Sequence, residues 1–177
     1  MKRVVTIGGL HGTGKSSVAD HIAERFELRR VSAGTIFREL AKERGLSLEE
    51  FSKVAEEDVE IDQLIDNRLR TEAEKGDIIT DGQLAGWMAG ENSDLNVYLM
   101  ASDETRVKRI AERDSRDFDE ALEETIAREA SERERYLEYY GVDILDLSIY
   151  DLVINTDLFS LDEVVEIVAA AVEGILF

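Results

Sequence analysis

Hydrophobic residues follow two alternating patterns along this chain. Short, nearly continuous apolar runs predict buried β-strands, and longer segments with an apolar residue every three or four positions predict amphipathic helices. The short runs predict strands at residues 4–7, 28–32, 77–81, 95–100 and 152–155. The longer segments predict helices at residues 17–26, 35–44, 47–55, 60–75, 104–113, 119–140 and 162–176. Because strands alternate with helices, we expect an α/β fold with a five-stranded parallel sheet covered on both faces.

The chain of 177 residues shows no internal repeat or linker, so we expect one domain spanning residues 1–177. A long helical excursion separates the second and third predicted strands. Within it, Ser47 and Glu50 form the pattern of a capping box, which predicts where one of its helices begins.

The most specific motif follows the first predicted strand. It matches the phosphate-binding pattern G-x-x-x-x-G-K-[ST] with Gly9-Leu10-His11-Gly12-Thr13-Gly14-Lys15-Ser16. Glycines let a backbone wrap closely around an anion, and the loop N–H groups and the following helix N-terminus point at bound phosphate. We expect Lys15 to reach the β- and γ-phosphates and the Ser16 hydroxyl to ligate Mg²⁺. An ordinary glycine-rich turn is the alternative, but the strand before and the helix after are the context that a nucleoside triphosphate site requires.

An acidic residue ends the third predicted strand. We expect this strand beside the first one, which places the Asp81 carboxylate where it would hold Mg²⁺ directly or through water. The alternative is that Asp81 is only a turn residue preceding Gly82.

Charge restricts the partners. The chain has 40 acidic and 21 basic residues, for a net charge of −19, and this field repels nucleic acid and anionic membranes, so we expect neither as a partner. No apolar run is long enough to cross a membrane. The absence of cysteine excludes disulfides and thiolate chemistry and fits the expected cytoplasmic location. An acidic surface is also typical of proteins from salt-rich cytoplasms, and this hypothesis stays open beside that of an ordinary acidic protein.

Nucleotide phosphates must still be neutralised, and two groups of arginines are suited to that task. Arg106, Arg109 and Arg113 recur on one face of a predicted helix, and Arg128 and Arg135 share a face of the next. The planar guanidinium binds phosphate oxygens bidentately. A salt-bridged surface helix is the alternative for any one of them.

Several segments together resemble the archaeal-type cytidylate kinases. They are the glycine loop, SAGTIFR at 32–38, DGQLAGWM at 81–88, REASERERY at 128–136 and SIYDLVINT at 148–156. The resemblance covers nearly the whole chain in the expected order. It implies a three-layer P-loop kinase fold with a helical NMP-binding insertion, here residues 38–75, and a short lid, here residues 113–119. It also implies a monomeric enzyme that transfers the γ-phosphoryl group of ATP to CMP or dCMP, with Mg²⁺, giving CDP or dCDP.

The resemblance also assigns roles to residues, several of which the loop motif already indicates. ATP binding falls to Gly9, Leu10, His11, Gly12, Thr13, Gly14, Lys15, Ser16, Ser17 and Arg109. Acceptor binding falls to Ser32, Arg38, Gln83 and Glu132. The expected catalytic cations are Lys15, Arg113, Arg128 and Arg135, and the residues expected to bind Mg²⁺ are Ser16 and Asp81.

Two positions depart from the family pattern. Gln83 stands where an arginine usually contacts the acceptor phosphate; it donates a hydrogen bond without charge, so the affinity and identity of the acceptor stay open. Leu10-His11 replaces a pair that usually contains proline, which should matter less because backbone N–H groups bind the phosphate there. Neither the ring of His11 nor that of His21 is given a catalytic role.

Two other functions remain open from the sequence. An adenylate kinase or a broader UMP/CMP kinase would share the fold and the phosphate chemistry. A nucleotide-dependent switch would bind partners instead, although the guanine-reading N-K-x-D pattern is absent and Asn155-Thr156-Asp157 resembles it only superficially. A screen of acceptors with ATP distinguishes the three.

Overall fold

Parallel strands form the centre of the computed structural model, which describes residues 2–176, with the side chains of residues 48, 49, 52 and 56 outside the description. The five strands are β1 (Val4–Gly8), β2 (Arg29–Ser32), β3 (Ile78–Asp81), β4 (Leu95–Met100) and β5 (Leu152–Asn155). Their order is β2-β3-β1-β4-β5, and every neighbouring pair is parallel. The predicted α/β class and the five strands are confirmed, with ends that differ by one residue at most.

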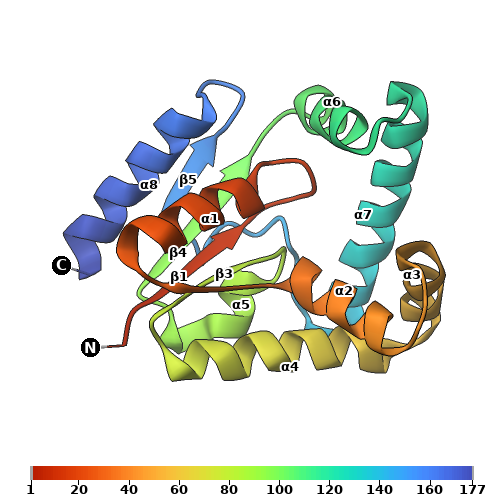
Figure 1. The fold of residues 1–177 in the computed structure, drawn as a ribbon, viewed down its shortest axis with the longest axis horizontal. Coiled ribbons are helices and arrows are strands. Elements are labelled where there is room, and N and C mark those ends of the chain that lie inside the picture. Colours follow the sequence, from red (N-terminus) through yellow and green to blue (C-terminus); the bar gives the residue numbers. More distant parts are fainter. Residues whose placement is uncertain (1, 177) are drawn as a thin grey trace.

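Helices cover the sheet and extend beyond one end of it (Figure 1). They are α1 (Lys15–Phe26), α2 (Ala33–Glu43), α3 (Leu48–Glu57), α4 (Val59–Lys75), α5 (Ala85–Ala89), α6 (Asp103–Asp114), α7 (Phe118–Tyr140) and α8 (Leu161–Leu176), with a 3₁₀ turn, η1, at Gly90–Asn92. One apolar core joins α1 and α8 to one face of the sheet, and α4 and α5 pack on the other. None of the helices within residues 2–176 is long and apolar enough to cross a membrane.

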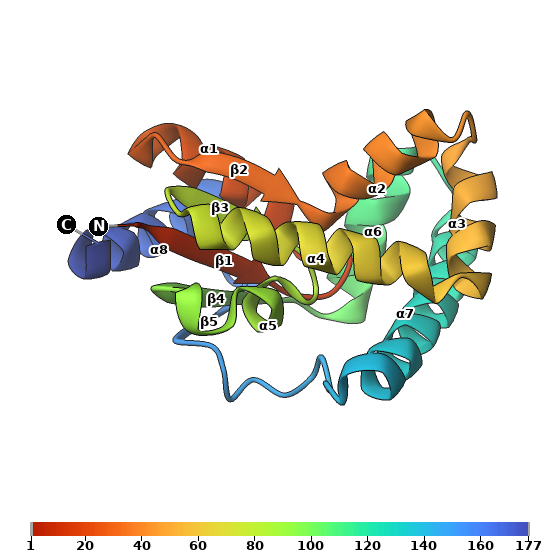
Figure 2. The same ribbon diagram turned by 90° about the horizontal axis from the view of Figure 1, so that it is seen from below.

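Between β2 and β3, α2 and α3 lie beyond the end of the sheet, and α4 reaches from the face of the sheet toward α3 and α7 (Figure 2). The expected capping box is present: the Ser47 hydroxyl accepts from the Glu50 N–H, and the Glu50 carboxylate accepts from the Ser47 N–H. A second apolar core, which includes Phe51, Ile61 and Ile144, joins these helices to the end of α7 and the segment after it. These helices therefore face the carboxyl ends of the strands.

The short helix α5 and the turn η1 were not expected from the sequence. Gly82 and Gly86 weaken a helical pattern in this segment. The structure gives Gly86 a reason: a Cβ there would lie 3.1 Å from the side chain of Ile149 and 3.3 Å from that of Asn96. Close packing on distant residues, which local sequence does not reveal, fixes this turn of helix.

Candidate active site

The glycine loop joins β1 to α1 at the centre of the carboxyl edge of the sheet. Gly9, Gly12 and Gly14 have φ angles of +141°, +79° and +92°, a region that favours glycine. A Cβ would lie 2.3 Å from the Leu99 carbonyl oxygen at Gly9, and 2.5 Å from the Arg106 carbonyl oxygen at Gly12. The loop conformation thus depends on the absence of side chains at these positions.

Lys15 begins α1 and folds back over the loop. Its Nζ donates a 2.6 Å hydrogen bond to the carbonyl of Leu10. Burial lowers the pKa of Lys15 to about 8, against the opposing influence of Asp81 and Glu132. The group is therefore mostly cationic at neutral pH and close to the loop, where a phosphate charge would stabilise it further.

Ser16 and Asp81 meet as the strand order requires. Asp81 lies opposite Ile7 in the register between β1 and β3, which confirms that their strands are neighbours. The Ser16 hydroxyl donates to Asp81 Oδ2 at 2.9 Å, while Arg30 pairs with Oδ1 at 3.0 Å. Burial raises the pKa of Asp81, although Arg30 and Ser16 pull it down. One hydroxyl and one carboxylate oxygen are hard donors that suit Mg²⁺, whose remaining ligands are usually water and phosphate.

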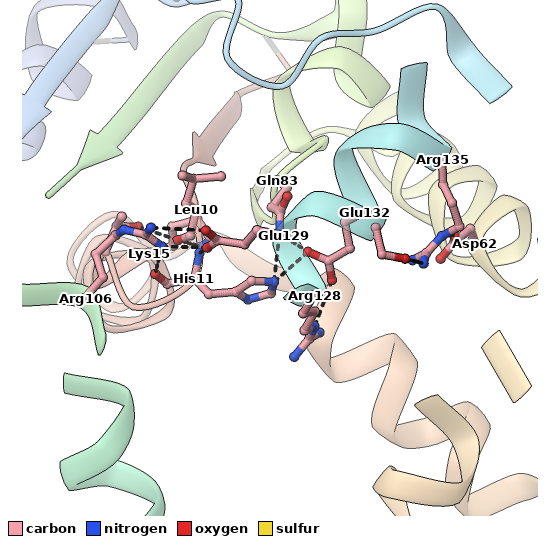
Figure 3. Close-up of polar contacts among 12 residues, drawn as sticks. Leu10, His11, Lys15, Asp62, Gln83, Arg106, Arg128, Glu129, Glu132 and Arg135 are labelled. Carbon is pink, nitrogen blue, oxygen red and sulfur yellow. Dashed lines mark hydrogen bonds and ion pairs between the residues drawn. The ribbon is translucent and has the colours of Figure 1, made fainter. Parts of the chain in front are cut away.

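Two carboxylates of α7 cover the loop (Figure 3). Glu129 Oε1 accepts from the backbone N–H of His11 at 3.1 Å and from Arg106 at 2.5 Å. Glu132 Oε2 contacts His11 Nε2 at 2.7 Å and accepts from Gln83 Nε2 at 2.6 Å. Sequence reasoning missed Glu129 altogether and gave the ring of His11 no partner.

Glu132 stays ionised although it is buried. Burial alone would raise its pKa, but the contacts with His11, Arg128 and Gln83 outweigh it and lower the pKa to about 2. Arg128 contributes a 2.9 Å ion pair through Nε. A fixed negative charge therefore lies between the loop and the arginines of α7.

The three arginines of α6 have different environments, although the sequence groups them on one face. Arg106 is only 3 % exposed and bonds to Asp103, Glu129 and the His11 carbonyl, so it packs the loop and is not available as a free cation. Arg109 donates to the hydroxyl and carbonyl of Thr156 at 2.9 and 3.0 Å. Arg113 is 68 % exposed and pairs with the adjacent Asp114.

Cationic residues from both arginine groups line one cavity. Arg113, Arg116 and Arg128 surround it together with His11. Arg116 pairs with Glu124 and Arg113 with Asp114, so each has a carboxylate partner in the structure as it stands. A phosphate entering this cavity would meet three guanidiniums beside the glycine loop and would compete with Asp114 and Glu124, which also line the cavity.

Arg135 lies one turn further along α7 than Glu132. It pairs with Asp62 of α4 at 3.0 Å and donates to the Ser131 hydroxyl at 2.8 Å. Asp62 was not singled out from the sequence, where it reads as part of a solvated helix face. Figure 3 shows this pair in line with Glu132 and the loop.

Three predicted site residues remain. Ser32 is the N-cap of α2, Arg38 lies within α2, and Ser17 lies in the first turn of α1. Ser32 is buried, and its hydroxyl caps α2 by accepting from the Thr35 N–H at 2.9 Å. Arg38 is exposed and donates to the Thr35 hydroxyl at 3.2 Å. Ser17 is exposed in the first turn of α1. Ser32 therefore has a structural task whether or not it also touches a ligand.

A solved structure shares this fold. The shikimate kinase of Bacteroides thetaiotaomicron matches with a TM-score of 0.62 at 15 % identity, over 98 % of this chain and 99 % of its own. At that identity the likeness concerns the fold alone. Together with the sheet order and the glycine loop, it places the protein in the class of small P-loop kinases.

Sequence relatives define the family within that class. A family model described as the cytidylate kinase-like family matches residues 4–158. The cytidylate kinase of Methanocaldococcus jannaschii is 47 % identical over 175 residues, covering 97 % of this chain and 98 % of that protein. The cytidylate kinase of Staphylothermus marinus is also 47 % identical, with 98 % of each chain covered. The chain belongs to the cytidylate kinase-like family.

Proposed function

We propose that this chain transfers the γ-phosphoryl group of ATP to CMP or dCMP, giving ADP and CDP or dCDP. The observation that carries the proposal is the 47 % identity with two cytidylate kinases over nearly the full length of the chain. The glycine loop would hold the phosphates of ATP, and the α7 face that contains Arg128 and Glu132 would hold the acceptor. Because all of these residues belong to one chain, the proposed acting unit is a monomer, and its proposed location is the cytoplasm.

The two nucleotides would meet at the loop, with residues 38–75 moving over the acceptor and residues 113–119 over ATP. Such closure excludes water, which would otherwise hydrolyse ATP. Arg109 and Arg113 would close on ATP from α6, and Ser32, Arg38 and Gln83 would contribute to the acceptor side. Ser16 and Asp81 would hold Mg²⁺, which supplies charge neutralisation between the phosphates.

The chemistry requires no general base. The attacking atom is a phosphate oxygen of the acceptor, which is already anionic near neutral pH. Catalysis then consists of in-line positioning and neutralisation of charge, for which this chain offers Lys15 and the arginines. In the structure, the Glu129 carboxylate accepts the hydrogen bond of the His11 N–H. A phosphate oxygen of bound ATP would take the place of this carboxylate at the His11 N–H.

The deciding experiment is an acceptor screen with ATP and Mg²⁺, in which CMP, dCMP, UMP and AMP are offered separately and ADP formation is followed. We expect CMP and dCMP to give the highest kcat/KM. A preference for AMP, or slow ATP hydrolysis that no acceptor accelerates, would contradict the proposal. As a control on the site, Lys15→Ala should lower kcat by roughly 10²–10³-fold, while circular dichroism shows that the fold is retained.

A further inference from the structure

Beyond Glu132, the acceptor side of the site ends in a partly enclosed ion pair between two helices. The side chains of Asp62 on α4 and Arg135 on α7 are 12 % and 16 % exposed, and they meet through Oδ2 and Nε. Glu132 and Asp62 are close enough that the charge of Glu132 raises the pKa of Asp62, adding to the effect of burial. Figure 3 shows the pair at the end of a row of side chains that starts at Lys15 in the glycine loop.

This pair leaves bonding capacity on both partners. Arg135 uses Nε for Asp62 and Nη1 for Ser131. Among the described side chains and backbone groups, no protein acceptor bonds to Arg135 Nη2 and no protein donor bonds to Asp62 Oδ1. The same ion pair therefore carries a free acceptor and a free donor, and it lies in line with Glu132 of the proposed acceptor site (Figure 3).

The charge around the pair disfavours a phosphate there. Asp62 neutralises Arg135, and one turn along α4 lies a second buried carboxylate, Asp66, which accepts a 2.6 Å hydrogen bond from the Tyr140 hydroxyl. The charges of Asp62 and Glu132 both act on Arg135, and an arginine beside two carboxylates is poorly suited to binding a dianion. It is better suited to a neutral polar group that presents a donor and an acceptor side by side.

Cytosine is such a group. Its 4-amino group is a donor, and acidic side chains accept hydrogen bonds from this group in other recognition sites. Its ring N3 and its O2 are acceptors. We infer that Asp62 accepts a hydrogen bond from the 4-amino group of the acceptor base while Arg135 donates to N3 or O2. This inference rests on the proposed function and assigns to the pair the choice of cytosine over uracil. Uracil presents a carbonyl at position 4 and an N–H at position 3, so it would set acceptor against carboxylate and donor against guanidinium.

The first test replaces the acceptor atom with a donor. Asp62→Asn keeps the size of the side chain and lets its amide donate to the 4-carbonyl of uracil. We expect the ratio of kcat/KM for CMP to that for UMP to fall by roughly 10–100-fold, with the KM for ATP unchanged. Asp143→Asn is the matched control, because Asp143 also pairs with an arginine of α7, Arg133, at an exposed site. The control should leave the ratio as it is in the unaltered enzyme.

A second test uses the unaltered enzyme and does not depend on whether a variant folds. The unaltered enzyme is offered the 5′-monophosphate of 2-pyrimidinone ribonucleoside, which is CMP without its amino group. We expect a similar 10–100-fold loss of kcat/KM relative to CMP. If Asp62→Asn folds, replacing CMP by this analogue should lower its kcat/KM by little more. The two changes remove the same contact, so their effects are not additive.

The outcomes separate the inference from the proposed function. If the unaltered enzyme fails to phosphorylate CMP, the proposed function is wrong. If it phosphorylates CMP but accepts the analogue equally well, or if Asp62→Asn leaves the CMP-to-UMP ratio unchanged, only the base-reading role is wrong and the pair merely clamps α4 to α7. A loss of stability in Asp62→Asn with an unchanged ratio would support that clamp and overturn the inference.

Discussion

Asp66 is a carboxylate that the fold holds away from water. The residue is 6 % exposed, and the hydroxyl of Tyr140 donates to its carboxylate. Burial raises its pKa to about 6, well above the usual range of an aspartate, and this effect is stronger than the opposing effects of Tyr140 and Arg70. The folded protein therefore holds this proton more tightly than the unfolded chain, and ionisation of Asp66 costs stability.

The sign of this shift gives a prediction for Asp66→Asn. The stabilising contribution of the protonated form is complete below about pH 4 and is lost as the pH rises through about 6. We therefore expect Asp66→Asn to raise the free energy of unfolding by about 1–3 kcal/mol at pH 8, and by less at pH 5. Urea unfolding of both proteins at the two pH values measures this. An equal effect at both would mean that the carboxylate is not perturbed as the structure indicates.

At the scale of elements, α6, α7 and the glycine loop are tied together by one buried cation. Arg106 of α6 bonds to Glu129 of α7 and to the carbonyl of His11 in the loop. Its Nε has no partner among residues 2–176, so the guanidinium is held by its two Nη atoms alone. The positions of α6 and α7 relative to the loop thus depend on a residue that need not touch substrate.

This tie predicts that Arg106→Met is strongly destabilising. The variant leaves Glu129 partly buried without its cation, a defect that usually costs about 3–5 kcal/mol. The double variant Arg106→Met, Glu129→Met should recover most of that loss, because neither buried charge remains. Chemical unfolding of the two variants and the parent checks both parts. A double variant as unstable as the single one would show that packing, and not the unpaired charge, is responsible.

The helices and strands themselves were largely predictable, and α5 shows why the exception arose. Elements such as β4 and α7 carry their pattern in consecutive residues, and their predicted ends fall within one residue of the observed ones. The segment around Gly86 has no such pattern, and a side chain at Gly86 would crowd Asn96 and Ile149, which come later in the chain. Local sequence reports local preferences, while contacts of this kind exist only after the chain has folded.

At the scale of the whole molecule, the excess of negative charge opposes the compact state. The net charge is −19, and outside the site two carboxylates, Glu166 and Glu173, share the single cation Arg25. Repulsion among exposed carboxylates falls when salt shortens the screening length, which is about 3 Å in 1 M salt against about 10 Å in 0.1 M.

We therefore expect KCl to stabilise the protein. The melting temperature should rise between low salt and about 0.5 M KCl and then level off, because screening is nearly complete at that concentration. Calorimetry or fluorescence melting across the series measures it. No gain between low and molar KCl would remove the hypothesis that the acidic surface is an adaptation to a salt-rich cytoplasm.

The sequence alone determined the sheet strands, nearly all of the helices, the glycine loop and the family, because each is encoded in neighbouring residues whose spacing is the signal. Only the tertiary structure decided which charges meet. Glu129 with Arg106 and the loop, and Asp62 with Arg135, join residues 23 to 118 positions apart. In the sequence a buried, paired carboxylate looks the same as a solvated one, since burial and partners depend on how distant elements pack.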